Sequence, residues 1–389
     1  MVNLGRTKLR KISGANQGSL PLHKKHAPDW WLFVSVLTLV CIGVIMVFSS
    51  SQYFAQYQPY NDTYYFLKEQ LKNVAIGLVV MLLAYRVDYH FYKKLIWPAA
   101  AVVGVLLLMV IFSDSGEESG GAMRWLNLGF VRFQPSELAK IALVILTAKI
   151  LTEHQRDIKT FKHGCLPPLL LMGVSCGLIY AQNDLGTCLV VAGMIFIMMF
   201  CAGVNLRYII GLIVIAVVGA LIAIFATNFR MGRITSWLDP WSDPLDGGFQ
   251  IIQSWFAIGS GGLTGMGLGA GSSKWFYLPA RHTDFIFAVL AEELGFLGAA
   301  FVVLLFALLT WRGLMIATRV ADPFGSLLAL GLTVMISWQA FINLAVVTGL
   351  LPITGITLPF ISYGGTSLLV SMGAMGLLLN ISRFTEAKR

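Results

Sequence analysis

Long apolar stretches recur along this 389-residue chain and constrain its fold more than any other feature. A helix of about 20 apolar residues spans the hydrocarbon core of a bilayer, which is about 30 Å thick. Ten stretches approach that length, at residues 31–50, 73–87, 95–112, 135–151, 165–181, 187–204, 208–226, 285–311, 326–348 and 358–381. Charged residues make up only 12% of the chain, whereas soluble domains contain about 25%. The pattern predicts an all-α integral membrane protein with ten transmembrane helices.

Basic residues mark one side of this predicted bundle. They precede the first stretch and follow the second, fourth and last ones, as at Lys93, Arg156 and Arg383. Cytoplasmic loops are rich in such residues, so both termini are expected in the cytoplasm. The predicted organisation is a basic cytoplasmic tail at 1–29, a single membrane domain at 30–384 and a second cytoplasmic tail at 385–389. This topology accounts for the net charge of +9 without a nucleic-acid partner.

A long connection at 227–282 joins the seventh and eighth predicted helices on the external side. Connections of this length are usually functional or disordered, and the many Trp, Phe and Ile residues argue against disorder. Within it, FQIIQSWFAI is compatible with a short helix on the membrane surface. The glycine-rich GSGGLTGMGLGAGSSK lacks G-x-x-x-x-G-K-[ST] and follows no predicted strand, which argues against a nucleotide-binding loop.

The cysteines and histidines give no sign of a metal or redox site. The five cysteines occur singly, without a C-x-x-C pair, and the six histidines show no ligand spacing. Neither a disulfide framework nor a structural zinc is therefore predicted. No organic cofactor is predicted either.

Several charged residues lie inside predicted spans or at their start, where a charge costs about 2.5 to 3.5 kcal/mol on insertion scales. They are Glu137, Lys140, Asp184, Glu292 and Glu293. Glu137 and Lys140 are three residues apart, so they share a helical face and can neutralise each other. As a group, these side chains either form structural pairs between helices or line a polar cavity.

Asp284 differs because it lies at the outer end of its predicted helix, beneath the long connection. There it can meet both water and a membrane-bound ligand, with helix capping as the alternative. Positive charge on the same side comes from Arg132, Arg230, Arg233 and Lys274. Guanidinium groups bind phosphate well, so these cations are candidates for that role, with anchoring at the membrane interface as the alternative. The combination suggests chemistry on a lipid-linked phosphate.

Longer sequence blocks follow in order between residues 123 and 367. They are MRWLNLG, FQPSELAK, QNDLGT, FRMGRITSWLDP, GGFQIIQSWFAIGSGGLTGMGLG, YLPARHTDFIFAVLAEELGFLG and TGLLPITGITLPFISYGGTS. Together they resemble the SEDS (shape, elongation, division and sporulation) family. The resemblance implies a ten-helix bundle in the bacterial cytoplasmic membrane that polymerises lipid II, a lipid-linked precursor of peptidoglycan, outside the membrane. It also implies a partner, a class B penicillin-binding protein that crosslinks the strands.

The same resemblance assigns roles to single residues. The essential aspartate of the family falls on Asp284, through HTDF, and its functionally sensitive basic positions fall on Arg132 and Lys140. Further substrate contacts are expected at Trp125, His282 and Ser362. Close helix packing is expected at Gly364 and Gly365. Two positions depart from the family pattern, since the family often has Glu where this chain has Ala280 and Pro where it has Asn183. Among the members of the family, the blocks QPSELAK and LPFISYGGTS are closer to FtsW and its sporulation counterpart than to RodA.

A mechanism follows from the leaving group that the resemblance implies. Glycoside hydrolases commonly need two carboxylates, because an alcohol leaving group must be protonated. A diphosphate is already a stable anion whose charge nearby cations can offset, so one carboxylate suffices. Asp284 is hypothesised to be the general base on the acceptor GlcNAc 4-hydroxyl, which attacks the anomeric carbon of the donor MurNAc. A Mg²⁺ or Mn²⁺ requirement is compatible with this chemistry, although no carboxylate cluster fixes a site.

The sequence is also compatible with two other functions. In a lipid II flippase, Glu137, Lys140, Glu292 and Glu293 would form a pathway at the midplane of the membrane, but such transporters usually consist of two related halves. No clear internal repeat is found in the sequence. A noncatalytic scaffold that recruits the transpeptidase is the third alternative. The choice among division, elongation and sporulation is also left open.

Overall fold

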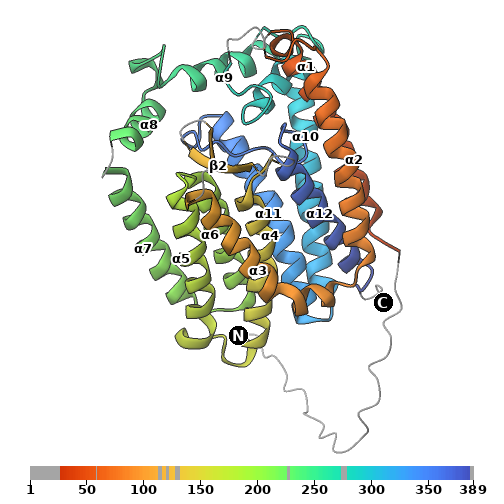
Figure 1. Cartoon of the computed structure of the whole chain (residues 1–389), viewed down its shortest axis with the longest axis vertical. Coiled ribbons are helices and arrows are strands. Elements are labelled where there is room, and N and C mark those ends of the chain that lie inside the picture. Colours follow the sequence, from red (N-terminus) through yellow and green to blue (C-terminus); the bar gives the residue numbers. More distant parts are fainter. Residues whose placement is uncertain are drawn as a thin grey trace, which may run out of the picture.

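The computed structural model describes residues 27–57, 59–112, 116–119, 122–127, 132–225, 228–272 and 278–385. Lys274 and most of the two predicted tails lie outside these residues. The described chain is predominantly helical, and its long helices run side by side in one bundle (Figure 1).

Each predicted apolar stretch overlaps a helix. These helices are α1 (Trp30–Ala55), α2 (Tyr65–Arg86), α3 (Tyr89–Phe112), α4 (Pro135–Glu153), α5 (Leu166–Ala181), α6 (Leu185–Ala202), α7 (Leu206–Phe225), α10 (Ile286–Arg319), α11 (Pro323–Val347) and α12 (Gly365–Ser382). Among the described residues, seven helices are long and apolar enough to cross a membrane, namely α1, α3, α5 with the turn before it, α6, α10, α11 and α12. In α2 and α4 charged residues such as Lys68 and Lys140 lower the hydropathy. The chain is a multi-pass membrane protein.

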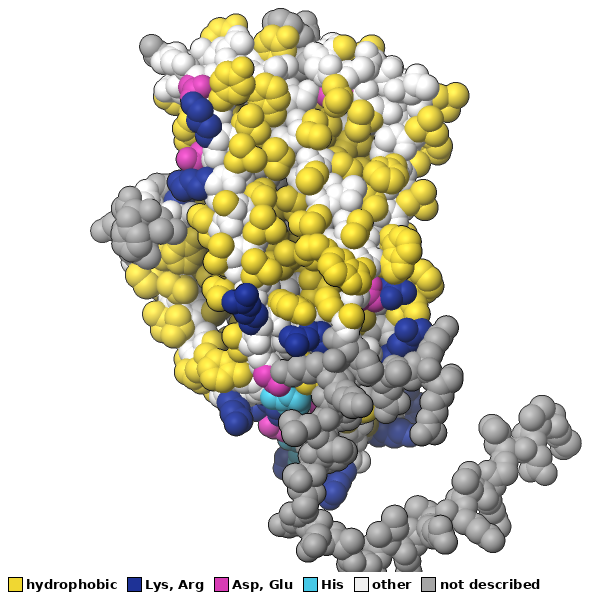
Figure 2. Space-filling view, turned by 90° about the vertical axis from the view of Figure 1, so that its right-hand side faces the viewer, with side chains coloured by type: hydrophobic (Ala, Val, Ile, Leu, Met, Phe, Trp, Pro, Cys, Tyr) yellow, Lys and Arg dark blue, Asp and Glu magenta, His cyan; other side chains and the backbone are white. Residues whose placement is uncertain are grey.

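The surface of the bundle carries a broad band of hydrophobic side chains (Figure 2). Val79, Val102 and Leu304 are each more than half exposed, at 56%, 58% and 65%. In Figure 2, Lys and Arg side chains gather below this band. Large apolar surfaces of this kind are expected where lipid replaces water.

The two ends of the described chain meet at one end of the bundle. Asp29 N donates to Ser382 Oγ at 3.2 Å, which joins the start of α1 to the end of α12. Arg312, near the end of α10, donates through Nε to Asp29 Oδ2 at 3.0 Å. The opposite end carries α8 (Asn228–Leu238) and α9 (Phe249–Ser260), as Figure 1 shows.

α8 and α9 are attached to the end of α11. Ser254 Oγ, Trp255 Nε1 and Trp237 Nε1 donate to the carbonyl oxygens of residues 347–349, at 2.7, 3.1 and 2.8 Å. Because the last carbonyls of a helix have no partner within it, these side chains satisfy groups that would otherwise need water. The stretch FQIIQSWFAI, singled out in the sequence, is helical and lies in α9.

A small antiparallel sheet corrects the all-α prediction. Its strands are β1 (Gly116–Ser119), β2 (Ala122–Asn127) and β3 (Arg132–Phe133), in that order. Leu126 of β2 pairs with Phe133 of β3 and is fully buried. Strands of two to six residues are too short for their alternation to stand out in the sequence. The described strands lie between α3 and α4 in the chain, and β2 contacts both of these helices.

Two predicted spans have different boundaries in the structure. The stretch 285–311 is interrupted at Gly295, whose φ of 67° and ψ of −169° are not helical. Loop residues 262–267 supply backbone hydrogen bonds there, among them Gly267 N to Glu293 O at 3.0 Å. The stretch 358–381 becomes helical only at Gly365, because Phe360 has a positive φ of 67° and the chain before α12 forms turns. Apolar composition alone does not show such turns.

The packing of α2 on α12 depends on a glycine. A Cβ at Gly376 would collide with the carbonyl oxygen of Met81, whereas a Cβ at Gly104 of α3 would meet nothing within 4 Å. Overpacking of this kind costs about 1–3 kcal/mol. We therefore expect Gly376→Ala to lower the Tm of the detergent-solubilised protein, while the control Gly104→Ala leaves it unchanged or slightly higher. Equal Tm values for the two variants would contradict this packing.

Candidate active site

Asp284 lies in a tight turn immediately before α10. Ala280 has a positive φ of 51°, and its carbonyl oxygen accepts hydrogen bonds from Thr283 N and Phe285 N at 3.1 and 3.2 Å. A positive φ is uncommon for a residue with a side chain and often marks a functional segment. The turn places Asp284 at the end of the bundle that also carries α8 and α9.

Three successive carbonyl oxygens of this turn accept hydrogen bonds from other elements. Tyr363 N, Ser362 Oγ and Asn343 Nδ2 donate to the carbonyls of residues 282–284, at 2.9, 2.6 and 2.8 Å respectively. Asn343 lies in α11, whereas Ser362 and Tyr363 belong to the segment before α12. The backbone of the turn is therefore fixed from neighbouring elements.

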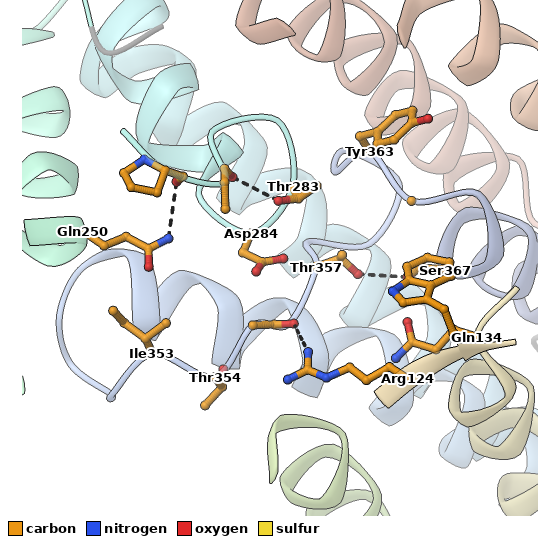
Figure 3. Close-up of a pocket in the computed structure, with 15 residues that line it drawn as sticks. Arg124, Gln134, Gln250, Thr283, Asp284, Ile353, Thr354, Thr357, Tyr363 and Ser367 are labelled. Carbon is orange, nitrogen blue, oxygen red and sulfur yellow. Dashed lines mark hydrogen bonds between the residues drawn. The ribbon is translucent and has the colours of Figure 1, made fainter. Parts of the chain in front are cut away.

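A pocket of about 420 Å³ opens beside Asp284 (Figure 3). Its walls come from β2, α9, the Asp284 turn, the segment before α12 and the first turn of α12. The lining residues are Arg124, Trp125, Gln134, Gln250, Pro279, Ala280, Thr283, Asp284, Ile353, Thr354, Gly355, Thr357, Tyr363, Gly364 and Ser367. Among the described residues, none makes a hydrogen bond to the Asp284 carboxylate, which leaves this group available to a ligand.

Arg124 is the cation that shares this pocket with Asp284. Its Nε lies 3.8 Å from Asp184 Oδ2, and its Nη1 donates to Gly355 O at 3.5 Å. Asp184 is itself fixed, since its Oδ1 accepts from Thr187 N at 3.1 Å and caps α6. The predicted cavity residue Asp184 thus holds Arg124 at the pocket wall.

Gly355 separates Arg124 from Asp284. It has a positive φ of 70°, and a Cβ built on it would lie 3.1 Å from Arg124 Nη1 and 3.6 Å from Asp284 Oδ2. A side chain at this position would therefore enter the space between the guanidinium and the carboxylate. The glycine keeps that space open for a ligand.

The protonation of Asp284 is set by its surroundings. Burial raises the pKa of the Asp284 carboxyl to about 6, and the charge of Asp184 adds to this rise, while Arg124 acts in the opposite direction. Burial disfavours the ionised carboxylate. A base with a pKa near 6 is ionised at neutral pH and is still able to accept a proton, which suits general-base catalysis.

Lys140 and Glu137 lie beneath the pocket and do not line it. Lys140 Nζ donates to Glu137 Oε1 at 2.8 Å and to Gln339 Oε1 at 2.6 Å. Gln339 Nε2 in turn donates to Thr357 O at 3.0 Å, and Thr357 bonds Ser367 through their hydroxyls at 3.0 Å. The buried ion pair is thus linked by hydrogen bonds to two residues of the pocket wall.

Glu292 and Glu293 lie away from the pocket, at the break in α10. Glu292 Oε1 accepts from Ser272 N at 2.7 Å, and Glu293 Oε2 accepts from Ser49 Oγ at 2.7 Å. Both side chains are almost fully buried. These contacts fit the structural alternative, in which the two carboxylates join α1, α10 and the glycine-rich loop.

The other predicted residues divide between the pocket and its support. Trp125 and Gly364 line the pocket, and Arg132 stacks over the Trp125 ring at 4.9 Å. His282 packs among aromatic rings, including Phe66 at 4.9 Å, and burial lowers its pKa to about 4. Ser362 holds the turn, as described above, and a Cβ at Gly365 would press on Asn73 of α2.

The remaining predicted cations are not placed in the pocket. Arg230 and Arg233 belong to α8, but their side chains lie outside what the structure describes, as does the whole of Lys274. Arg281 is buried, and its Nε donates to Ser50 O at 3.3 Å, toward α1.

The described residues do not form a resident site for Mg²⁺ or Mn²⁺. No group of three or more His, Cys, Asp or Glu side chains able to hold a metal occurs among them. Both oxygens of Asp184 already accept hydrogen bonds from Thr187, which leaves Asp284 as the available carboxylate of the described pocket lining. Mg²⁺ is usually held by one or two carboxylates together with substrate phosphates.

Several residues of the site did not stand out in the sequence. Gln250, Gln339, Asn343 and Thr357 are neutral polar residues in otherwise apolar or loop segments, where they resemble ordinary packing residues. The repeat of amides at positions 339 and 343, one helical turn apart in α11, was the available signal. Arg124 was not assigned to the site from the sequence.

The opening at Gly355 can be tested by filling it. We expect Gly355→Ala to lower turnover at least tenfold, because the methyl group enters the space between Arg124 and Asp284. Gly203→Ala is the matched control, since Gly203 also has a positive φ of 89° but a Cβ there would meet nothing within 4 Å. Both variants share the backbone strain of about 1–2 kcal/mol. Equal activities of the two variants would contradict the role of this space.

The chain resembles known proteins in both sequence and structure. A family model described as "Cell cycle protein", for FtsW, RodA and SpoVE, matches residues 29–387. The chain is 44% identical over 356 residues to a probable peptidoglycan glycosyltransferase FtsW from Geobacter sp. (strain M18), covering 91% of this chain and 96% of that protein. It is 43% identical over 363 residues to stage V sporulation protein E from Bacillus subtilis (strain 168), covering 93% of this chain and 99% of that protein.

Solved structures agree with these sequence matches. A structure described as "Structural coordination of polymerization and crosslinking by a peptidoglycan synthase complex" aligns with a TM-score of 0.75 at 32% identity, covering 92% of this chain and 98% of that one. The crystal structure of the rod shape determining protein RodA from Thermus thermophilus aligns with a TM-score of 0.65 at 28% identity, covering 93% of this chain and 99% of that one. The resemblance predicted from the sequence blocks is confirmed.

Proposed function

Because the chain belongs to the cell cycle protein family of FtsW, RodA and SpoVE, we propose that it polymerises lipid II into the glycan strands of peptidoglycan. Its sequence relatives include proteins named as probable peptidoglycan glycosyltransferases. The observation that carries the proposal is the pocket in which Asp284 and Arg124 face the same open space. A carboxylate base beside a guanidinium suits the transfer of a sugar from a diphosphate.

We propose a topology that places this pocket outside the membrane. Ten helices cross the bilayer, so that both termini lie in the cytoplasm. The hydrogen bond from Asp29 to Ser382 supports this arrangement, since it joins the two described ends of the chain. The Asp284 pocket then opens at the outer face of the bacterial cytoplasmic membrane, beneath α9.

In the proposed reaction Asp284 accepts the proton of the GlcNAc 4-hydroxyl of the acceptor. The hydroxyl oxygen forms a bond to the anomeric carbon of the donor MurNAc, and the bond from that carbon to the lipid diphosphate breaks. The diphosphate leaves with the bonding electron pair. Arg124 offsets its charge from the pocket wall, and Arg132, stacked on Trp125, adds positive charge nearby. Electrostatic stabilisation of this kind is often the largest contribution to catalysis.

Metal and partner requirements are part of the proposal. A Mg²⁺ or Mn²⁺ ion would arrive on the diphosphate of the substrate, where it supplies further charge neutralisation. The partner is a transpeptidase of the class B penicillin-binding protein type. The structural similarity to a chain of a peptidoglycan synthase complex supports this partner.

The decisive experiment measures glycan strands made by the purified protein from lipid II in detergent. General-base catalysis contributes about 10²- to 10⁴-fold, so Asp284→Asn should lose at least 100-fold. The control is Asp246→Asn, because Asp246 is an exposed aspartate of the external connection that does not line the pocket. Lipid movement in vesicles without polymer would indicate a flippase, and neither activity would indicate a scaffold.

The pH dependence follows from the raised pKa of Asp284. Below a pH of about 6 the carboxylate is increasingly protonated and unable to act as a base. We expect kcat/KM to fall about tenfold per pH unit on this acid side and to reach a plateau above it. Rates measured across buffers of equal ionic strength check this limb. A plateau that extends down to pH 4 would contradict the assignment of Asp284 as the base.

A further inference from the structure

Asn343 connects the two walls of the pocket. It lies in α11, it is only 1% exposed, and its Nδ2 donates to Asp284 O at 2.8 Å and to Ile356 O at 2.7 Å. Asp284 belongs to the turn before α10, whereas Ile356 follows Gly355 on the opposite wall. One side chain amide thus contacts both of the segments between which a ligand would lie.

The orientation of this amide is determined by its partners. An amide nitrogen carries two hydrogens, and each of the two carbonyl oxygens takes one of them. The reverse orientation would place Oδ1 against both carbonyls, where two acceptors repel each other. Asn343 can therefore hold the two walls only through its nitrogen.

A second amide of the same helix face holds the next residue of the wall. Gln339 lies one turn before Asn343, and its Nε2 donates to Thr357 O at 3.0 Å. Its Oε1 accepts from Lys140 at 2.6 Å, which directs the nitrogen toward the wall. Residues 356 and 357 are thus fixed to α11 by two successive amides.

This connection bears on Asp284 because Asn343 holds the backbone carbonyl of that residue. No described residue donates a hydrogen bond to the Asp284 carboxylate, so its position depends on that of its backbone. A displacement of about 1 Å can lower a rate by about 100-fold. We propose that Asn343 is a positioning residue, which sets the separation between the Asp284 carboxylate and the Gly355 wall. The proposal rests on the function proposed above.

Asn343→Leu tests this, with Asn380→Leu as the matched control. Asn380 is also a buried asparagine, 2% exposed, whose amide joins two elements through Tyr85 O at 2.6 Å and Tyr89 N at 3.1 Å. It lies near the end of α12, at the opposite end of the bundle from the pocket. Both variants lose a buried amide of the same size, but only one of them lies at the pocket.

Three quantities are measured with lipid II as substrate. They are kcat per folded molecule, KM, and the pH at which kcat/KM falls on the acid side of its pH profile. For Asn343→Leu we expect kcat to fall at least tenfold with KM within about threefold. The midpoint of the acid side of the profile should move from about pH 6 toward lower pH. A displaced Asp284 carboxylate is more exposed to water, which lessens the effect of burial on its pKa. Asn380→Leu should keep the kcat and the midpoint of the wild type. A purely structural role of Asn343 would change the yield of folded protein but none of these quantities.

A kcat and an acid-side midpoint of Asn343→Leu equal to those of Asn380→Leu would overturn the proposal. If Asn343→Leu does not fold, Asn343→Asp replaces it, since a carboxylate has the same shape but cannot donate to both carbonyls. The same loss of kcat is expected for that variant, and wild-type kcat in it would also overturn the proposal. Absence of polymer from the wild type would instead contradict the proposed function, so the two failures are distinguishable.

Discussion

The site depends on hydrogen bonds to the backbone of the turn that carries Asp284. Asn343, Ser362 and Tyr363 donate to three successive carbonyl oxygens, at 2.6 to 2.9 Å. A buried carbonyl without a partner is costly, so each donor stabilises this turn in one conformation. The side chain of Asp284 is left free of such bonds within the described pocket. The fold therefore fixes the carboxylate in space without reducing its ability to accept a proton.

The charged side chains around the pocket are likewise held in place by partners. Asp184 holds Arg124 at the wall, and Lys140 is neutralised by Glu137 and directs Gln339 instead of facing the pocket. Buried charges are costly unless paired, which explains why these groups occur as pairs. α11 links the pocket to α8 and α9, because its C-terminal half carries Gln339 and Asn343 and the carbonyl oxygens at its end accept hydrogen bonds from both helices.

The sequence predicted the helices well because apolar runs of this length have few alternatives in a membrane. It also pointed to Asp284, since a carboxylate at the mouth of a span is exceptional. The break at Gly295 and the turns before Gly365 were missed, because their backbone groups are satisfied by residues distant in the chain. Arg124 meets Asp284 only through the folded sheet and Gly355, and no spacing in the sequence encodes that contact.

The central claim is that the fold holds Asp284 as a base with a raised pKa, and its protonation can be measured directly. Difference infrared spectra of the wild type against Asp284→Asn isolate the signal of this one carboxyl group as pH is varied. The account predicts a titration midpoint near 6, because burial disfavours the ionised form. A midpoint near 3.8, the ordinary value for aspartate, would contradict it.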